Sequence, residues 1–356
     1  MVTLARLGEF ISQGHQVTVI QPSTHHYYSG MGPGMLGSTY NPGDIRFATR
    51  HVVEKAKALF IQDYAETIDP IKKTVLLRSG TTVDYDVLSC NAGSFVPRAC
   101  IQTEADDVFT VKPIEALIKA QQRLIEICAK KKAVIALVGG GPSAAELAGN
   151  ILQLAKSRNL NIPQLRIFSS TEFMGRFPAK IRQKVIKSLC KRGVEILENS
   201  RVSQAGKGQV VLESGSSYQA DQIFMALGVK PSEIFTNSGL PVGPDGGLLV
   251  NKFLQSTGYP EIFGGGDCIY FQDQALDKVG VYAVRQNPVL CHNLLAALTG
   301  GELQSFDPGG AYLLIFNLGE GLGVLHKSWL TLDGRLAFVI KDYIDRKFMK
   351  KFQEIE

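Results

Sequence analysis

The strongest constraint on the fold lies near the middle of the chain, where a buried strand leads directly into a glycine-rich turn and then a helix. The apolar run Ala133–Val138 is followed by Gly139–Gly141 and then by a helical segment that begins at Pro142. In a Gly-x-Gly-x-x-Ala turn, the first glycine permits a tight turn, the second lets a pyrophosphate approach the backbone, and the alanine allows close packing of helix and strand. The segment therefore predicts a dinucleotide-binding βαβ unit. A glycine-rich turn in an unrelated α/β domain is the alternative.

The next strand of this unit carries no acidic residue at its end, where one normally binds the hydroxyl groups of a ribose. Leu165–Ser170 is the predicted strand, and Ser169 and Ser170 occupy the end where the acidic residue is expected. Two interpretations of Arg176 stay open: contact with the 2′-phosphate of NADPH, or an ordinary solvent-exposed side chain. The sequence alone leaves the choice between NADH and NADPH undecided.

Composition limits the class of protein. The chain has 356 residues, 45% of them hydrophobic and 20% charged, which is typical of a globular protein of two or three domains. A net charge of +5, spread along the chain, argues against nucleic acid as a partner. No apolar run approaches the roughly 18 residues of a membrane-spanning helix. The six cysteines contain no Cys-x-x-Cys pair and the histidines are dispersed, so we expect reduced structural thiols and no metal site.

The first residues resemble the second half of a βαβ unit. Leu4, Leu7 and Ile11 share one face of a predicted helix, Gly14 follows it, and residues 16–21 predict a strand. A helix of this kind crosses over from a preceding parallel strand. We therefore expect the natural protein to begin earlier, by about a strand and a turn. No secretory signal is visible, so we expect a cytoplasmic protein.

Further elements are predicted along the chain. The stretch Gly30–Met35 predicts a loop, either a flexible surface turn or a backbone that lies against a flat ligand. Asp86–Ser94 predicts an apolar strand that ends in small residues, and Pro113–Lys131 predicts a long helix. Glu261–Cys268 predicts a strand ending in Gly-Asp, where a carboxylate can accept hydrogen bonds from ligand hydroxyl groups. Residues 279–298 predict another helix.

The tail is predicted to hold two or three strands and a final helix. Ala311–Phe316 and Leu336–Ile340 are the clearest strand candidates. Four apolar residues of the helix are expected to share one face: Ile344, Phe348, Phe352 and Ile355. A basic amphipathic helix can lie on an anionic membrane surface. Packing against its own domain is the alternative, which the acidic residues of the tail favour.

Taken together, these segments resemble the FAD-dependent pyridine nucleotide-disulfide oxidoreductase superfamily, and within it type II NADH dehydrogenases and sulfide:quinone reductases most of all. The resemblance spans nearly the whole chain. It rests on four motifs at residues 86–94, 139–146, 226–231 and 264–267. The order and spacing of four motifs are far more specific than any one of them.

The resemblance implies an α/β fold with two Rossmann-like three-layer domains, one for FAD and one for NAD(P), and a small C-terminal α+β domain. The FAD-binding domain would comprise residues 1–112 and 254–310 and would lack its first strand and glycine-rich turn. The NAD(P)-binding domain, residues 113–253, would be inserted in it. Residues 311–356 would form the C-terminal strands and helix.

The resemblance also implies which residues hold the cofactors. Gln21 stands where the family usually places Glu or Asp against the adenosine ribose of FAD, and Asp267 matches the carboxylate that binds the flavin ribityl chain. The residues implied for FAD are Gln21, Ala92, Gly93, Ser94, Gly266, Asp267, Val279, Gly280 and Gln286. Those implied for NADH or NADPH are Gly139, Gly141, Pro142, Ser143, Ala144, Glu146 and Gly228. The flavin carries the chemistry, so no catalytic side chain and no metal are assigned.

The implied function is hydride transfer from NAD(P)H to the flavin, followed by electron delivery to a small-molecule acceptor such as a quinone. A sulfide or other small-reductant:quinone reductase is the alternative, which is disfavoured because Ser143 stands where the resemblance implies one of two paired thiols. The Cys-x4-Cys pair of the disulfide reductase branch is also absent. A non-catalytic nucleotide-binding scaffold is the third alternative, because the turn expected to hold the FAD pyrophosphate is missing from this chain. A homodimer and contact of the last helix with a membrane stay open.

Overall fold

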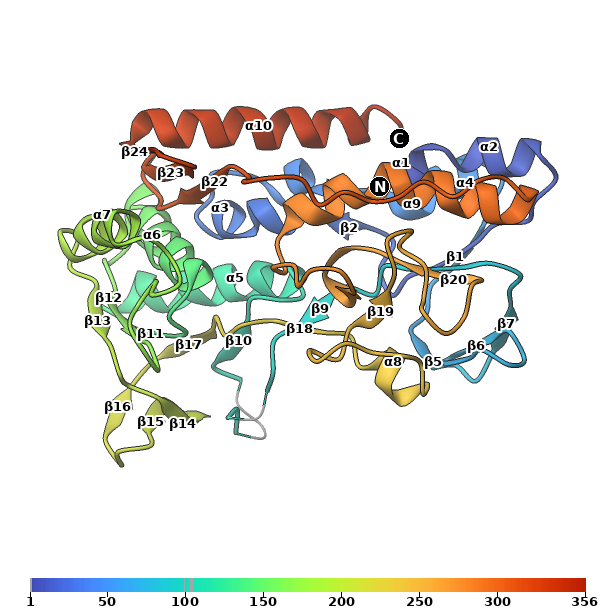
Figure 1. The fold of residues 1–356 in the computed structure, drawn as a ribbon. Helices are drawn as coiled ribbons and strands as arrows, with labels where there is room; N and C mark the ends of the chain where they lie inside the picture. The colour runs from blue at the N-terminus through green and yellow to red at the C-terminus, as the bar shows by residue number, and fades with distance from the viewer. Residues whose placement is uncertain (1, 99, 103–105) are drawn as a thin grey trace.

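A five-stranded parallel sheet carries the glycine-rich turn. The computed structural model describes residues 2–98, 100–102 and 106–356. The strands lie in the order β10 (Val108–Thr110), β17 (Gln222–Met225), β11 (Val134–Val138), β12 (Gln164–Phe168) and β13 (Glu195–Leu197). Every neighbouring pair is parallel. Figure 1 shows the sheet beside α5 (Glu115–Lys130), α6 (Pro142–Ser157) and α7 (Ala179–Cys190).

Strand β11 is central because both of its faces are apolar. Ile135 and Leu137 have no exposed surface and pack in the core that α5 and α6 share with the sheet. Ala136 and Val138 point to the other face, where they pack with Val210 of a small antiparallel sheet. That sheet consists of β14 (Val202–Gly206), β15 (Gln209–Leu212) and β16 (Ser217–Gln219). Burial on both faces gives the continuous apolar run that is typical of a parallel strand.

The other half of the molecule contains three two-stranded parallel sheets, one of which pairs β19 (Leu248–Val250) with β21 (Ile269–Phe271). β1 (Thr18–Ile20) pairs with β4 (Leu59–Ile61), and β8 (Leu88–Cys90) pairs with β20 (Ile262–Gly264). In the five-stranded sheet, β11 joins the equivalent pairs β12–β13 and β17–β10. Within residues 2–98, 100–102 and 106–356, no strand joins the β1–β4 pair to the β8–β20 pair in this way. α4 (Thr49–Lys55) packs on β4, and α9 (Gly280–Thr299) packs on β20.

Shorter elements connect these parts. Those before residue 90 are α1 (Val2–Ala5), α2 (Leu7–Ser12), β2 (His26–Tyr27), η1 (Ser29–Met31), α3 (Gly32–Leu36), η2 (Pro42–Ile45), β3 (Arg46–Phe47), β5 (Ala65–Asp69), β6 (Thr74–Leu77) and β7 (Thr82–Asp84). Those after it are β9 (Ser94–Phe95), β18 (Lys230–Pro231), α8 (Ile234–Asn237), β19 (Leu248–Val250), η3 (Gly266–Cys268) and β21 (Ile269–Phe271).

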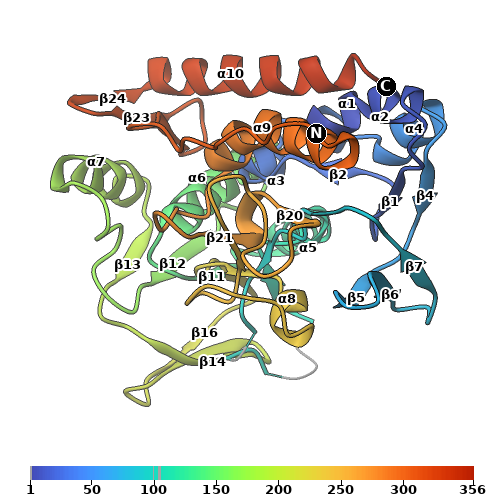
Figure 2. The same ribbon diagram turned by 45° about the vertical axis from the view of Figure 1, so that its right-hand side comes forward.

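The C-terminal segment spans both halves. An antiparallel sheet of β22 (Leu314–Asn317), β23 (Gly323–Lys327) and β24 (Leu330–Gly334) leads into α10 (Arg335–Gln353). α10 packs on all three of these strands and also contacts β3 and η2 from the N-terminal part. Figures 1 and 2 both show α10 along the top of the molecule, above α9. The last helix thus connects segments that are far apart in the sequence.

The prediction of a strand at Leu336–Ile340 is wrong, because these residues form the first turns of α10. Leu336 and Val339 are 61% and 58% exposed, so no second layer buries one face of an alternating pattern here. The predicted apolar face of this helix is also only partly correct. Phe348 and Phe352 pack inward, whereas Ile344 is 42% exposed.

The prediction of a loop at Gly30–Met35 is wrong as well. This stretch forms the end of η1 and most of α3, and Met31 and Met35 are buried. α3 packs against α5 and α6, and the small residues permit this close contact. A Cβ at Gly34 would lie 2.5 Å from the ring of Tyr40. The glycines serve helix packing here, not a turn.

Helix α6 and the chain just after β22 are close enough to give a packing prediction. A Cβ at Gly149 would lie 1.9 Å from the carbonyl oxygen of Leu318. We expect Gly149→Ala to lower the free energy of unfolding by roughly 1 to 3 kcal/mol, because two backbone segments must then separate. Chemical denaturation measures this loss. Gly8→Ala on the exposed face of α2 is the control, since its added Cβ meets no atom within 4 Å. An equal loss in both variants would contradict the explanation.

Candidate functional site

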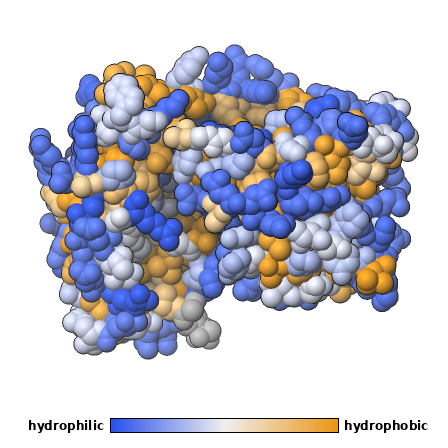
Figure 3. All heavy atoms as spheres, viewed as in Figure 1, coloured by the Kyte–Doolittle hydropathy of each residue, from blue (hydrophilic) through white to orange (hydrophobic). Residues whose placement is uncertain are grey.

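One large cleft, about 2900 Å³ in volume, runs between the two halves of the molecule. Figure 3 shows the surface hollowed between its left and right parts. The chain just beyond β11 and β12 lines one side of the cleft, and the chain just beyond β8 and β20 lines the other. Ligands of parallel α/β sheets bind at the carboxyl ends of the strands. Here these ends from both sheet regions open into the same space.

The glycine-rich turn lies on the wall of this cleft. Gly139 has a φ of +145°, and a Cβ there would lie 2.1 Å from the carbonyl oxygen of Ala226, so no larger residue fits. At Gly141 an added Cβ would meet no atom within 4 Å, and the backbone is open to a ligand. The turn leads directly into α6, a helix of 16 residues. The free N–H groups at its start provide a site for an anion.

The sequence-predicted nucleotide residues gather around this turn. Those that line the cleft are Gly139, Gly141, Pro142, Ser143, Glu146 and Gly228. Ala144 does not line it, because its side chain is fully buried beneath the turn. This position agrees with the packing role that the sequence predicts for it.

The residues predicted for the other cofactor gather on the opposite wall. Those that line the cleft are Gln21, Ala92, Gly93, Ser94, Gly266, Asp267, Val279 and Gly280. Gln286 is 1% exposed, and its Oε1 accepts a hydrogen bond of 2.7 Å from the backbone N–H of Gly266. It holds the segment that carries Asp267 and does not itself face the cleft. Gln21 donates through Nε2 to the carbonyl oxygens of Ser23 and His25, at 2.6 and 2.8 Å.

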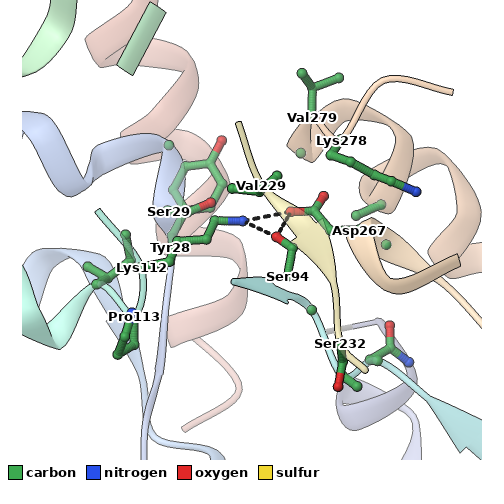
Figure 4. Close-up of a pocket in the computed structure, with 18 of the residues that line it drawn as sticks. Tyr28, Ser29, Ser94, Lys112, Pro113, Val229, Ser232, Asp267, Lys278 and Val279 are labelled. Carbon is green, nitrogen blue, oxygen red and sulfur yellow. Dashed lines mark hydrogen bonds and ion pairs between the residues drawn. The ribbon is translucent and has the colours of Figure 1, made fainter. Parts of the chain in front are cut away.

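Asp267 belongs to a hydrogen-bonded cluster with Lys112 and Ser94. Figure 4 shows both side chains pointing toward the carboxylate. Lys112 Nζ lies 2.6 Å from Asp267 Oδ2 and donates to Ser94 Oγ at 2.7 Å, and Ser94 Oγ donates to the same carboxylate oxygen at 2.7 Å. Burial disfavours the charged carboxylate, but the charge of Lys112 and the two hydrogen bonds outweigh it and lower the pKa of Asp267. The carboxylate is therefore ionised at neutral pH.

Glu146 joins a second charged cluster, between α6 and α10. Its Oε1 accepts a hydrogen bond of 2.8 Å from the backbone N–H of Asn317. On α10, Lys341 Nζ lies 2.7 Å from Asp345 Oδ2, and Tyr28 Oη donates to Asp345 Oδ1 at 3.4 Å. Burial raises the pKa of Glu146 to about 7, although the charge of Lys341 opposes this. Burial also raises the pKa of Asp345. Glu146 can therefore exchange a proton near neutral pH.

Sequence reasoning did not single out Lys112, Lys341 or Asp345. The i,i+4 spacing of Lys341 and Asp345 is visible in the sequence, but such pairs are usually on a solvated helix face. Lys112 precedes a proline and has no neighbouring motif. No local signal shows that these residues are buried, because their partners come from distant segments.

Of the six cysteines, Cys90 and Cys100 line the cleft. Cys90 and Cys268 are buried, and burial raises the pKa of Cys268 to about 11 and also raises that of Cys90. Within the described part of the chain, no group of three His, Cys, Asp or Glu residues could hold a metal ion. None of the described helices has both the length and the apolar character needed to cross a bilayer.

Comparison with known proteins gives a family match. The family model described as "Pyridine nucleotide-disulphide oxidoreductase" matches residues 1–293. Ferroptosis suppressor protein 1 of Taeniopygia guttata is 27% identical over 294 residues, which cover 79% of this chain and 74% of that protein. Demethylphylloquinone reductase NdbB of Synechocystis sp. is 24% identical over 359 residues, which cover 96% and 87% of the two chains.

A solved structure confirms the fold class. The sulfide:quinone oxidoreductase of Aquifex aeolicus matches with a TM-score of 0.82 and 18% identity, covering 100% of this chain and 89% of that one. At this identity the match shows a shared fold. The predicted α/β architecture with two Rossmann-like domains is therefore confirmed, whereas the predicted domain boundaries stay predictions.

The raised pKa of Glu146 gives a stability prediction. Its pKa rises from 4.5 to about 7 on folding, so between these values the unfolded chain loses a proton that the folded chain keeps. Stability should fall as the pH rises through this range. Glu146→Gln keeps the acceptor for Asn317 and cannot ionise. We expect this variant to match the wild type at about pH 4 and to exceed its free energy of unfolding by roughly 1 to 3 kcal/mol at about pH 8.

Chemical denaturation at both pH values measures the difference. Glu126→Gln is the matched control, because the Glu126 side chain on α5 is 61% exposed. It should follow the wild type at both pH values. A pH-independent difference between Glu146→Gln and the wild type would contradict the assignment.

Proposed function

The chain belongs to the pyridine nucleotide-disulphide oxidoreductase family, with FAD and NADH or NADPH as cofactors, and on this premise we propose that it passes hydride from NAD(P)H to the flavin and delivers the electrons to a quinone. The observation that carries this proposal is a single cleft lined by both the glycine-rich turn and the Asp267 cluster. A hydride donor and an acceptor can meet in one water-poor space only if their sites adjoin.

The residues around the cleft fit the two cofactors. A volume of about 2900 Å³ exceeds the roughly 300–1,000 Å³ of a site for one small ligand. Added Cβ atoms at Gly93, Gly228 and Gly280 would meet no atom within 4 Å, so the backbone faces open space at these points. The ionised carboxylate of Asp267 provides an acceptor for the hydroxyl groups of a ribityl chain.

Each wall has its own part in binding. At the glycine-rich turn, the first N–H groups of α6 hold the pyrophosphate of the nicotinamide nucleotide. On the opposite wall, the carboxylate of Asp267 would accept hydrogen bonds from the hydroxyl groups of the ribityl chain, and Ser94 and Lys112 hold that carboxylate in place. The start of α9 at Gly280 lines the cleft, and its partial positive charge would stabilise negative charge on a bound flavin. FAD, when bound, supplies a two-electron carrier between nicotinamide and acceptor.

The cluster between α6 and α10 suits the acceptor side of the reaction. Reduction of a quinone to a quinol takes up two electrons and two protons. Four residues near this cluster line the cleft: Tyr28, Ile344, Asp345 and Phe348. Ile344 and Phe348 provide apolar walls beside the Asp345 carboxyl group. Burial raises the pKa of the Asp345 carboxyl, and Tyr28 Oη donates a hydrogen bond to it, so these two residues form the proposed route for a proton to the quinone. The name of the relative NdbB, a demethylphylloquinone reductase, supports a quinone acceptor.

Sulfide chemistry is not proposed. The thiolate form is the nucleophile in such reactions, and burial raises the pKa of both Cys268 and Cys100. These thiols stay protonated at neutral pH. The match to a sulfide:quinone oxidoreductase therefore supports a shared fold and not a shared reaction.

Anaerobic mixing tests the electron path. We expect NADPH or NADH to bleach the visible absorbance of the FAD-loaded protein, and a short-chain quinone to restore it. Asp267→Asn should weaken FAD retention by about tenfold or more, because a charged acceptor for ligand hydroxyl groups is lost. Asp273→Asn, on an exposed segment outside the cleft, is the control. Flavin that stays oxidised with both nucleotides would refute the proposal.

We further propose that α10 places the cleft at a membrane surface, where a quinone is found. Three exposed apolar residues share one face of this helix at Leu336, Val339 and Tyr343, and Trp329 in the β23–β24 turn is 87% exposed. We call these four residues the C-terminal apolar patch. Lys347 continues the same helical face and is exposed. An apolar stripe with flanking basic residues suits an anionic interface.

The only tryptophan of the chain reports on this contact. Trp329 should shift its fluorescence to shorter wavelength when mixed vesicles of phosphatidylcholine and phosphatidylserine are added. Leu336→Glu should weaken vesicle binding about tenfold, because a charged side chain then faces the lipid. Ile71→Glu, at an apolar residue that is 80% exposed but far from the patch in the sequence, should bind as the wild type does. An unshifted Trp329 spectrum would rule out the contact.

A further inference from the structure

Where β12 ends, the cleft is lined by hydroxyl groups. In a nucleotide site that favours NADH, an acidic residue at this position binds both ribose hydroxyl groups. Here Ser169, Ser170 and Thr171 follow Phe168, and all of them line the cleft. Three hydroxyl groups thus stand where one carboxylate is usual.

The side chain of Ser169 packs against the glycine-rich turn. Its side chain is 1% exposed, and its Oγ has no hydrogen-bond partner among the described residues. A Cβ at Gly140 would lie 2.0 Å from this oxygen, so the hydroxyl group lies directly against the glycine-rich turn. A buried hydroxyl group without a partner costs free energy, and a bound ligand can supply the missing hydrogen bond.

The loop after Ser169 is fixed to the same turn. The backbone N–H of Met174 donates to the carbonyl oxygen of Gly140 at 2.7 Å, and that of Ser200 donates to the carbonyl oxygen of Ser169 at 2.7 Å. These bonds hold the loop over the end of β12. They bring the backbone near Arg176 and Arg201 close to the glycine-rich turn and the end of β12, and both arginines line the cleft.

The two glutamates near the end of β12 form ion pairs with another arginine, Arg182. Glu172 and Glu198 both pair with Arg182, at 3.0 and 2.6 Å, and Glu198 also accepts a hydrogen bond from the backbone N–H of Phe173. Within the described residues, no carboxylate lies within 4.0 Å of the Arg176 guanidinium. Arg201 has only a loose pair with Glu213, at 3.8 Å, and both side chains are more than 60% exposed. Such an exposed pair is weak and screened.

These observations bear on the choice of nucleotide. With the pyrophosphate at the start of α6, the adenosine ribose lies beside the end of β12. A carboxylate there would repel a 2′-phosphate of about two negative charges. Hydroxyl donors and a guanidinium without a carboxylate partner bind such a group instead, since charge-assisted hydrogen bonds to phosphate are strong.

We infer that this site selects a nucleotide that carries a 2′-phosphate, NADPH rather than NADH, through Arg176 with Ser169, Ser170 and Arg201 beside it. The inference rests on the proposed function, because it specifies the hydride donor of the same cleft. Arg176 is a specificity-determining residue that acts on the nucleotide, remote from the transferred hydride.

Calorimetric titration of the full-length chain with 2′,5′-ADP and with 5′-ADP tests the inference without hydride transfer. We expect 2′,5′-ADP to bind about tenfold more tightly or better, with an advantage that shrinks as salt is added. Arg176→Gln should remove most of this advantage and leave 5′-ADP binding unchanged. Ser170→Asp should reverse the preference, because a carboxylate then faces the 2′-phosphate.

Arg158→Gln is the matched control, since Arg158 is an exposed arginine at the opposite end of α6. It should keep the full preference for 2′,5′-ADP. Equal or tighter binding of 5′-ADP overturns the inference and leaves the proposed function intact. The same holds if Arg176→Gln changes binding no more than Arg158→Gln does. Failure of both ligands to bind overturns the inference together with the nucleotide site of the proposed function.

Discussion

The contact between the backbones of Gly139 and Ala226 sets the position of the whole site. Any side chain at Gly139 would overlap the carbonyl oxygen at 2.1 Å, so β11 can end close beside β17 and turn at once into α6. The start of α6 then lies at the edge where the parallel strands end. The loop with Arg176 depends on the same turn, because Met174 is hydrogen-bonded to Gly140.

Helix α10 connects this turn to the rest of the molecule. Glu146 lies one turn into α6, and it meets Asn317 of β22 and the charge of Lys341 on α10. A pKa of about 7 results from that packing, because burial disfavours the charged carboxylate. The same helix carries three residues of the C-terminal apolar patch, Leu336, Val339 and Tyr343, on its outer face. Proton-exchanging groups and the proposed membrane contact therefore occupy opposite faces of one helix.

The predictions from sequence succeeded where a single segment holds the information. The strand, glycine turn and helix at 133–148 are local, and so is the small-residue strand end before Asp267; both lie on the cleft as expected. Two predictions failed where the pattern was ambiguous. Gly30–Met35 was expected to be a loop and Leu336–Ile340 a strand, but each belongs to a helix. Short runs of glycine or of apolar residues do not reveal which surface will cover them.

The sequence by itself determined the fold class, the family and the glycine-rich turn, because each depends on residue types at short spacings. Only the tertiary structure placed Lys112 against Asp267, 155 residues away, and Lys341 near Glu146. It also paired Glu172 with Arg182. Arg176, by contrast, lines the cleft. Burial and charge pairing decide the pKa values of these groups and underlie the nucleotide preference that we infer. Both depend on neighbours that folding brings together from distant parts of the chain.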